Sequence, residues 1–204
     1  MEASVEAPRK LEGDKAQRIV AAMRASVAAR GAAASTFDHV AREAGVSRGL
    51  LHYYFGSKER LLVEVVRHDC KVKIEAMEER LARADSVDAI VQALVYGLEE
   101  FVEEEPGSQA VTYEMLSASR HSEEIRAELA EVYRRWRSHL AEALREKESQ
   151  GVVHLQADPD SVAAVLFALG DGFGIQLSSD PGWESGPAFD LGVRTARGLL
   201  GEKA

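Results

Sequence analysis

The chain has 204 residues, of which 46% are hydrophobic and 29% are charged, and its formal net charge is −9. This composition supports one or two folded domains and argues against wholesale disorder. An acidic total also argues against nucleic-acid binding, because phosphate repels an acidic surface. The charge is unevenly divided, however: residues 1–68 carry 11 Lys/Arg and 8 Asp/Glu, and the remaining residues carry 14 and 26.

The most basic part of the chain is residues 15–60, with 8 Lys/Arg and 3 Asp/Glu. A basic head joined to an acidic body indicates two separate tasks. The single cysteine, Cys70, excludes an intramolecular disulfide and fits a reducing compartment. No apolar run reaches the roughly 18 residues of a membrane span, and residues 1–13 lack the apolar core of a signal peptide. We therefore expect a cytoplasmic protein without a membrane partner, in which residues 1–13 form a flexible arm.

Helical spacing of apolar residues dominates the sequence, and strand-like alternation is nearly absent. In the N-terminal third we expect helices over residues 14–30, 35–44, 47–55 and a long segment from residue 57 onward. Asp14 and Ser35 begin capping boxes for the first two helices, and Ser47 caps the third. Gly31 and Gly45 are the expected stops of the first two helices.

Longer helices are expected in the acidic body, over about 86–105, 108–118, 122–150, 159–178 and 188–200. Pro106 and Gly107 break the chain between the first two, and Asp158 caps the fourth ahead of Pro159. The sequence thus predicts an all-α fold of about nine helices. The expected domain boundary lies inside the long helix near residues 66–73, and it separates residues 14–68 from residues 69–204.

Residues 37–55 have the pattern of a helix-turn-helix, whose second helix enters the major groove of DNA. Gly45 suits the turn because it accepts positive φ, and the small Ala41 lets the two helices approach. Arg48 lies in the first turn of the second helix, where base edges and phosphates are within reach. The competing interpretation is an ordinary pair of packed helices, but the local positive charge favours DNA.

The candidate DNA contacts fall into three groups. Hydroxyls and free backbone amides at the helix starts, together with a lysine, suit phosphates. Arg48, His52 and Tyr53 donate to bases or phosphates, and Leu50 meets a thymine methyl group. The full set is Ser35, Thr36, Ser47, Arg48, Gly49, Leu50, His52, Tyr53, Tyr54 and Lys58.

Residues 15–62 resemble the tetracycline-repressor (TetR/AcrR) family of bacterial transcriptional regulators. The resemblance is carried by Ser35-Thr36-Phe37, Val40 to Gly49, His52 to Phe55 and Ser57-Lys58-Glu59, in this order and spacing. The family more often has a small or hydroxyl residue in place of Leu50 and a proline in place of Gly56. The resemblance implies that the residues beyond about 70 form a helical ligand-binding and dimerisation domain.

The resemblance also implies that the last two helices build a homodimer interface and that a small molecule binds among the helices before them. Small side chains permit close helix approach, and the candidate dimer contacts are Ala168, Gly170, Gly174, Phe189, Val193 and Leu200. The candidate ligand contacts are Tyr96, Tyr113, Met115, His121, Trp136, His139 and Phe167. Each of these is also explained as an ordinary core or surface residue.

The expected function is a homodimeric repressor that a small molecule releases from a palindromic operator. A ligand-independent architectural DNA-binding protein and a transcriptional activator stay open as alternatives. An enzyme is not expected, because His-Glu-x-x-His, a phosphate-binding glycine loop and a nucleophile elbow are all missing. No cofactor or metal is expected either: adjacent helical residues such as His68, Asp69 and Cys70 diverge and do not converge on one ion. Cys70 is a buried thiol or, alternatively, a redox switch.

Overall fold

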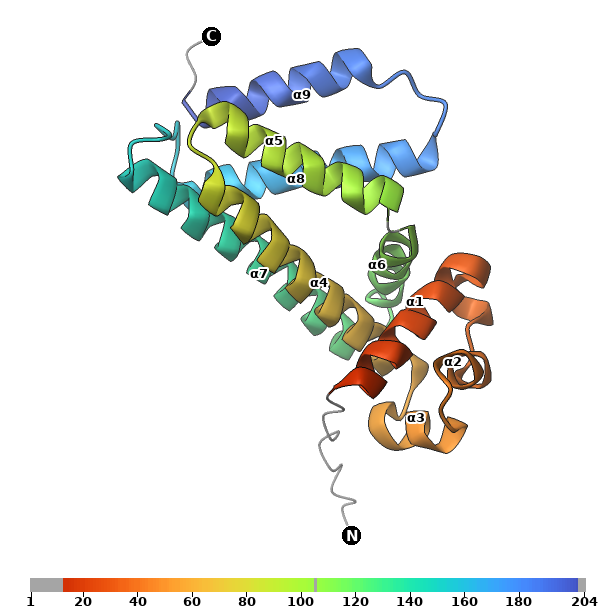
Figure 1. Cartoon of the computed structure of the whole chain (residues 1–204). Coiled ribbons are helices and arrows are strands. Elements are labelled where there is room, and N and C mark those ends of the chain that lie inside the picture. The colour runs from red at the N-terminus through yellow and green to blue at the C-terminus, as the bar shows by residue number, and fades with distance from the viewer. Residues whose placement is uncertain (1–12, 105, 202–204) are drawn as a thin grey trace. The chain divides into compact units, whose positions relative to one another are not determined.

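The computed structural model describes residues 13–104 and 106–201 (Figure 1). These residues form nine α-helices and one π-helical segment, which confirms the expected all-α class. The helices are α1 (Asp14–Ala34), α2 (Phe37–Ala44), α3 (Arg48–Phe55), α4 (Lys58–Arg83), α5 (Val87–Glu99), the π-helical η1 (Glu100–Glu104), α6 (Pro106–Ala118), α7 (Glu123–Ser149), α8 (Pro159–Ser179) and α9 (Gly186–Leu199). The expected arm over residues 1–13 lies outside the described residues, apart from its last residue.

Polar side chains begin several helices as the sequence predicts. The Ser47 hydroxyl accepts a hydrogen bond from the Leu50 backbone N–H at 3.2 Å, which fixes the start of α3. Asp158 accepts from the Ser161 backbone N–H at 3.0 Å, and a proline at the first helical position follows it. The hydrogen bonds from Ser161 also hold the pKa of Asp158 below its usual range. These two predicted caps are confirmed.

Two predicted N-cap residues differ from those in the structure by one position. Gly13 precedes α1 in place of Asp14, and no side chain caps that end. Thr36 caps α2 in place of Ser35, because its hydroxyl accepts a hydrogen bond from the His39 backbone N–H at 3.4 Å. At α2 the capping-box spacing therefore identified the right turn but the wrong hydroxyl.

Ser35 is fully buried, and its side chain hydrogen-bonds the backbone near the C-terminal end of α1. Its hydroxyl donates to the Gly31 carbonyl oxygen at 2.8 Å and accepts from the Ser26 hydroxyl at 2.9 Å. Gly31 has φ 74°, a left-handed conformation that glycine adopts without a Cβ clash, and it kinks the helix where the sequence predicts a stop. The Ser35 hydroxyl is thus not available to a phosphate, in contrast to the prediction.

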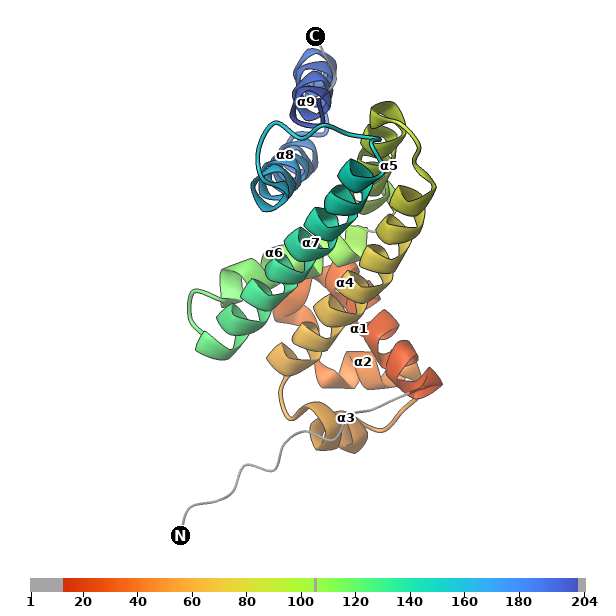
Figure 2. The same ribbon diagram turned by 90° about the vertical axis from the view of Figure 1, so that its left-hand side faces the viewer.

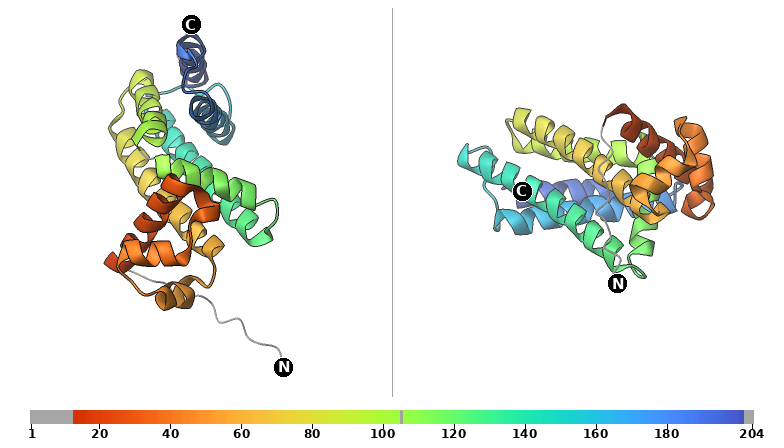
Figure 3. Two further views of the ribbon diagram at one scale, coloured as in Figure 1. Left: turned by 90° about the vertical axis from the view of Figure 1, so that its right-hand side faces the viewer. Right: turned by 90° about the horizontal axis from the view of Figure 1, so that it is seen from below.

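The chain divides into two compact units, unit 1 (Met1–Asp69 and Pro106–Ala130) and unit 2 (Cys70–Glu105 and Glu131–Ala204). In unit 1, α1 lies against α2 and α6 (Figure 3). Its largest fully buried side chains include Ile19, Met23, Leu51, Leu61 and Met115. Because α6 and the start of α7 group with the N-terminal residues, these units differ from the predicted division after residue 68. That functional division stays a prediction.

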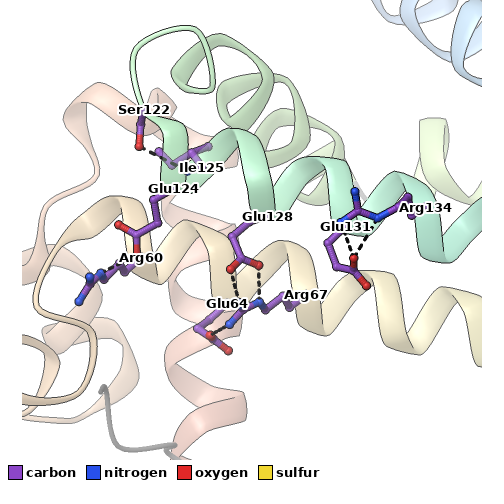
Figure 4. Close-up of polar contacts among 9 residues, drawn as sticks. All are labelled: Arg60, Glu64, Arg67, Ser122, Glu124, Ile125, Glu128, Glu131 and Arg134. Atoms are coloured by element: carbon purple, nitrogen blue, oxygen red, sulfur yellow. Dashed lines mark hydrogen bonds and ion pairs between the residues drawn. The ribbon is translucent and has the colours of Figure 1, made fainter. Parts of the chain in front are cut away.

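Ion pairs within unit 1 join the first half of α4 to the first turns of α7 (Figure 4). Arg60 Nε donates to Glu124 at 2.9 Å, and Arg67 Nε donates to Glu128 at 2.9 Å. Arg67 also donates to Glu64 on its own helix at 2.6 Å. Burial alone lowers the pKa of Arg67, but the hydrogen bonds and charges of Glu128 and Glu64 outweigh it and raise the pKa. The helix that follows α3 is therefore tied to α7.

Unit 2 has an aliphatic core to which the second half of α4 and helices α5, α7, α8 and α9 contribute (Figure 2). Its most buried large side chains are Leu81, Ile90, Leu140, Leu144 and Leu200. A charged residue, Lys147, is also buried in this unit. Its ammonium group donates to the carbonyl oxygens of Ala82 at 3.0 Å and Ala84 at 2.7 Å, so it satisfies the C-terminal end of α4.

Replacing Lys147 with methionine is expected to lower the free energy of unfolding by about 2 kcal/mol. Methionine keeps the apolar stem but leaves both carbonyl oxygens without their donor. Thermal unfolding followed by circular dichroism measures the effect, which corresponds to a loss of about 4–8 °C in Tm. The matched control is Lys71→Met, because Lys71 pairs only loosely with Glu75, at 3.8 Å on the surface. Equal losses in both variants would contradict the prediction.

Helix α8 is the one described helix that is long and apolar enough to cross a membrane by length and composition alone. Its 18-residue window has a mean hydropathy of 1.4, although Asp171 interrupts the apolar run. One such helix is weak evidence for a membrane, because core helices of soluble proteins pass the same test. Only 22% of the window is buried, so a large part of α8 is uncovered in a single chain.

Candidate DNA-binding and ligand-binding sites

Helices α2 and α3 form a pair joined by a short turn that begins at Gly45. Gly45 has φ 66° and ψ 37°, the left-handed conformation that the sequence predicts for the turn. The Val46 backbone N–H donates to the Ala41 carbonyl oxygen at 2.9 Å and closes it. Val40 and Leu51, one from each helix, are fully buried. The apolar side chains of the pair thus pack on its inner face, and its polar side chains lie on the outer face.

Most of the predicted DNA contacts lie on the outer surface of this pair. The exposed ones are Thr36, Ser47, Arg48, Gly49, His52 and Tyr53, and the half-buried ones are Leu50, Tyr54 and Lys58. Positions 48, 49, 52 and 53 share one face of α3, because residues four apart lie one above the other on a helix. The Tyr53 and Tyr54 rings meet edge to face with their centroids 5.1 Å apart. Leu50 is less exposed than the sequence suggests.

Two of the basic candidates have partners within the chain. Lys58 donates to the Ala32 carbonyl oxygen at 2.8 Å, so it ties the start of α4 to the end of α1. Arg48 Nη1 donates to an oxygen of Asp38 at 3.2 Å. Sequence reasoning missed the contact between Asp38 and Arg48, because Asp38 has the spacing of a capping-box partner.

A helix pair with a left-handed glycine turn and an exposed, basic second helix defines a helix-turn-helix DNA-binding protein. Residues 19–65 match the family described as bacterial regulatory proteins, tetR family. Residues 83–199 match the C-terminal domain of BetI-type transcriptional repressors. The chain belongs to the TetR family, and it is a DNA-binding transcriptional regulator of the BetI type, a repressor class. The family resemblance seen in the sequence is confirmed.

Relatives over much of the chain are regulators as well. The HTH-type transcriptional regulator BetI of Agrobacterium fabrum is 32% identical over 171 residues, which cover 78% of this chain and 79% of that protein. BetI of Rhizobium meliloti is 35% identical over 120 residues, and this match spans 57% of each protein. The structure of reduced Escherichia coli NemR shares the fold, with a TM-score of 0.77 over 94% of this chain and all of that one at 19% identity. Family membership confirms that the chain is a regulator and not an enzyme.

The seven predicted ligand contacts are divided between the two units. Tyr113, Met115 and His121 belong to unit 1, where Met115 is buried and His121 is exposed. The other four belong to unit 2. There, the exposed Tyr96 ring lies under the Arg80 guanidinium, and His139 pairs with Glu78. Met115, Tyr96 and His139 thus have ordinary structural explanations, as a core residue or as the partner of a charged side chain.

Trp136 and Phe167 do come together, from α7 and α8. Their rings stack with centroids 5.8 Å apart. Tyr133, which the sequence analysis did not select, meets Phe167 edge to face at 5.5 Å, and its hydroxyl hydrogen-bonds the Asp171 carboxylate. Helical spacing was the available signal, because Tyr133 lies one turn before Trp136 and Asp171 one turn after Phe167. We call these four residues the ring cluster.

Burial raises the pKa of Asp171, and the hydrogen bond from Tyr133 opposes this rise only in part. Between the pKa of Asp171 in the unfolded chain, about 3.9, and its higher pKa in the folded chain, the folded chain therefore holds a proton that the unfolded chain has released. The free energy of unfolding therefore decreases as the pH rises from about 3.9 toward the pKa of Asp171 in the folded chain, and below about pH 3.9 there is no such loss.

Asp171→Asn removes this loss, so the Tm of the variant minus that of the wild type is expected to rise between pH 4 and pH 7. Thermal melts of both proteins across this range measure the difference. The matched control is Asp85→Asn, which makes the same substitution at an exposed position outside the ring cluster. A difference for Asp171→Asn that stays flat or falls would contradict the burial argument.

Two of the six predicted dimer contacts pack inside their own chain. A Cβ atom on Gly174 would lie 3.6 Å from the Leu98 side chain, and Leu200 is fully buried in the core of unit 2. Neither is available to a partner, in contrast to the prediction. Of the other four, Ala168 is exposed and Gly170, Phe189 and Val193 are half-buried.

Large exposed apolar side chains that the prediction did not include also lie on the last two helices. Val165 and Ile175 on α8 are 45% and 46% exposed, and Leu191 on α9 is 57% exposed. On α8, positions 165, 168, 172 and 175 alternate steps of three and four residues, which places them along one seam. We call Val165, Ile175 and Leu191 the α8–α9 stripe. The spacing of the α8 residues can be read from the sequence, but the predicted interface was based on the small residues of the same helix instead.

Cys70 lies on α4 with 3% of its surface exposed. A redox-sensitive cysteine needs access for the oxidant and an environment that stabilises the thiolate. Burial therefore favours the interpretation of Cys70 as a small core residue.

Proposed function

We propose that this regulator is a homodimeric repressor that binds a palindromic operator through two copies of α3 and releases it when a small molecule binds. The observation that carries the proposal is the exposed face of α3 with Arg48, His52 and Tyr53, held by the Ser47 cap and the buried Leu51. In this proposal residues 14–68 read the DNA, residues 69–204 bind the effector and the second subunit, and the protein works in the bacterial cytoplasm.

The proposed DNA contacts are the predicted set without Ser35. Thr36 and the amides at the start of α2 face phosphate, as do Tyr54 and the Lys58 ammonium. Base edges in the major groove meet Arg48, Leu50, His52 and Tyr53. Ser47 and Gly49 let the backbone at the start of α3 approach the duplex closely.

The α8–α9 stripe is the proposed dimer contact. Exposed apolar side chains at regular helical spacing are costly in water and are commonly covered by a partner. A Cβ atom on Gly170 or Gly172 would meet nothing within 4 Å, so packing within the chain does not explain why glycine stands there. Glycine lowers helix stability by up to about 1 kcal/mol relative to alanine. Close approach of a second α8 supplies a reason, and it also explains the uncovered apolar surface of this helix.

A dimer with two-fold symmetry requires an operator with matching symmetry. One helix-turn-helix reads too few base pairs to be specific, whereas two copies read an inverted repeat. Their half-sites are expected to lie about 34–36 Å apart or a multiple of that distance.

The ring cluster is the proposed effector site. Aromatic faces attract cations, and a half-buried carboxylate gains its charge more easily when a cation lies beside it. The cluster therefore favours a small molecule that combines positive charge with apolar groups. Because α7 carries Tyr133 and Trp136 and also the ion pairs to α4, a ligand that shifts α7 would change the equilibrium of the helix that follows α3.

The test has two stages, both with the full-length protein. Selection from a random DNA pool at fixed salt should yield one inverted repeat. A thermal-shift screen of cationic, neutral and anionic metabolites should then yield a cation that raises Tm and weakens operator binding. Trp136→Leu should abolish that shift, while Tyr96→Leu should keep it.

Selection of no motif would overturn the DNA-binding proposal. Operator binding that no stabilising ligand changes would indicate the ligand-independent alternative. An operator whose occupancy raises transcription of the neighbouring gene would indicate an activator.

A further inference from the structure

The Arg48 side chain is held at two points, although it is exposed. Its Nη1 donates to Asp38 Oδ2 on α2 at 3.2 Å, and its Nε donates to His52 Nε2, one turn further along α3, at 3.3 Å. A long side chain in water normally samples many rotamers. These two bonds, from both helices of the pair, select one direction for the guanidinium group.

His52 is in turn fixed by a core residue. Its ring and the Phe37 ring pack edge to face with the centroids 4.8 Å apart, and Phe37 is buried at the start of α2. The imidazole thus cannot swing freely away from Arg48. The position of the guanidinium is therefore linked to the packed interior of the helix pair through His52 and to α2 through Asp38.

The two bonds leave enough donors for DNA. A guanidinium has five N–H groups, and Asp38 and His52 use one on Nη1 and the one on Nε. Both N–H groups of Nη2 and one of Nη1 are left. Two of these are what a bidentate contact to O6 and N7 of guanine requires.

We propose that Asp38 is a positioning residue that aims Arg48 at a guanine in each half-site. This inference rests on the proposed DNA contact of Arg48. A mobile arginine binds phosphates anywhere along the backbone, which adds affinity without sequence information. An arginine held by Asp38 meets a base edge with less ordering on binding, and it is kept from neighbouring phosphates. Asp38 therefore increases specificity more than affinity.

An exposed ion pair contributes little to folding, so Asp38 can be changed without losing the fold. Asp38→Asn removes the charge that orders Arg48. The matched control is Glu43→Gln, which removes one negative charge from an exposed position on the same helix. If Asp38 acted only by repelling phosphate, the two variants would behave alike.

The experiment compares the wild type, Asp38→Asn and Glu43→Gln by selection from a random pool and by titration of single-base operator variants. We expect Asp38→Asn to lower the preference for guanine at one position of each half-site by about 10-fold. Binding to non-specific DNA should stay the same or strengthen. Glu43→Gln should keep every base preference, and Asp38→Asn should change nothing further in an Arg48→Ala background. Asp38→Glu, which keeps the charge, should retain part of the preference.

The outcomes separate this inference from the proposed function. A wild type that selects no motif overturns the function, and the inference with it. If the wild type selects a motif and Asp38→Asn selects it with the same preference at every position, only the inference fails. It also fails if Asp38→Asn still changes base preference after Arg48 has been removed.

Discussion

Leu191→Glu is expected to convert the dimer into monomers and to weaken operator binding about 1,000-fold. Leu191 is the most exposed side chain of the α8–α9 stripe. Under two-fold symmetry one substitution places two carboxylates in the interface, where each loses its hydration without gaining a partner. A monomer presents a single α3, and its affinity falls toward the non-specific level, which for DNA-binding proteins lies about 10³–10⁷ below the specific one.

Sedimentation velocity at micromolar concentration measures the oligomeric state, and a gel shift at fixed salt measures the affinity. The matched control is Leu116→Glu, which places the same charge at another apolar residue of similar exposure, on α6. It should leave the dimer intact. A Leu191→Glu protein that sediments as a dimer would exclude the stripe as the interface, and so would a Leu116→Glu protein that dissociates as readily.

Local chemistry made most of the fold predictable from the sequence. Ser47, Asp158 and Gly45 each act within a few residues of their own position, through a cap or a left-handed turn, so their roles follow from order and spacing. Where two neighbouring residues have the same capping chemistry, the sequence does not specify which of them caps the helix. Both Ser35 and Thr36 can cap a helix, and the partner that buries Ser35 is Ser26, nine residues away.

The sites were less predictable, because they depend on which faces meet across the fold. The aromatic character of Trp136 and Phe167 was visible, but their contact and the neighbouring carboxylate of Asp171 require two helices to pack. Gly174 has the small size expected at a dimer interface, yet it faces Leu98 of its own chain. The neighbouring Ile175 is exposed because other positions of α8, such as Val162 and Leu166, pack into the core of unit 2, and the spacing alone does not specify which face packs.

Arg48→Ala is expected to weaken operator binding by about 100-fold or more without unfolding the protein. A bidentate contact between arginine and guanine contributes about 1–3 kcal/mol of discrimination, and the dimer loses two of them. Competition gel shifts with the selected operator and with non-specific DNA measure the loss. Thermal melting should show Tm close to that of the wild type, because exposed ion pairs such as that with Asp38 contribute little.

Arg134→Ala is the matched control, because Arg134 is also exposed, 60% against 59% for Arg48, and also pairs with a carboxylate. It should leave operator binding unchanged, which separates a contact from a general loss of charge. Arg48→Lys distinguishes the kind of contact: lysine keeps the charge but loses the fork that reads guanine. If Arg48 meets a base, Arg48→Lys loses specificity nearly as far as alanine does. If Arg48 contacts only phosphate, Arg48→Lys keeps the affinity of the wild type. Arg48→Ala then weakens binding to all DNA sequences equally, and the slope of log K against log salt concentration falls by about one for each α3 of the dimer.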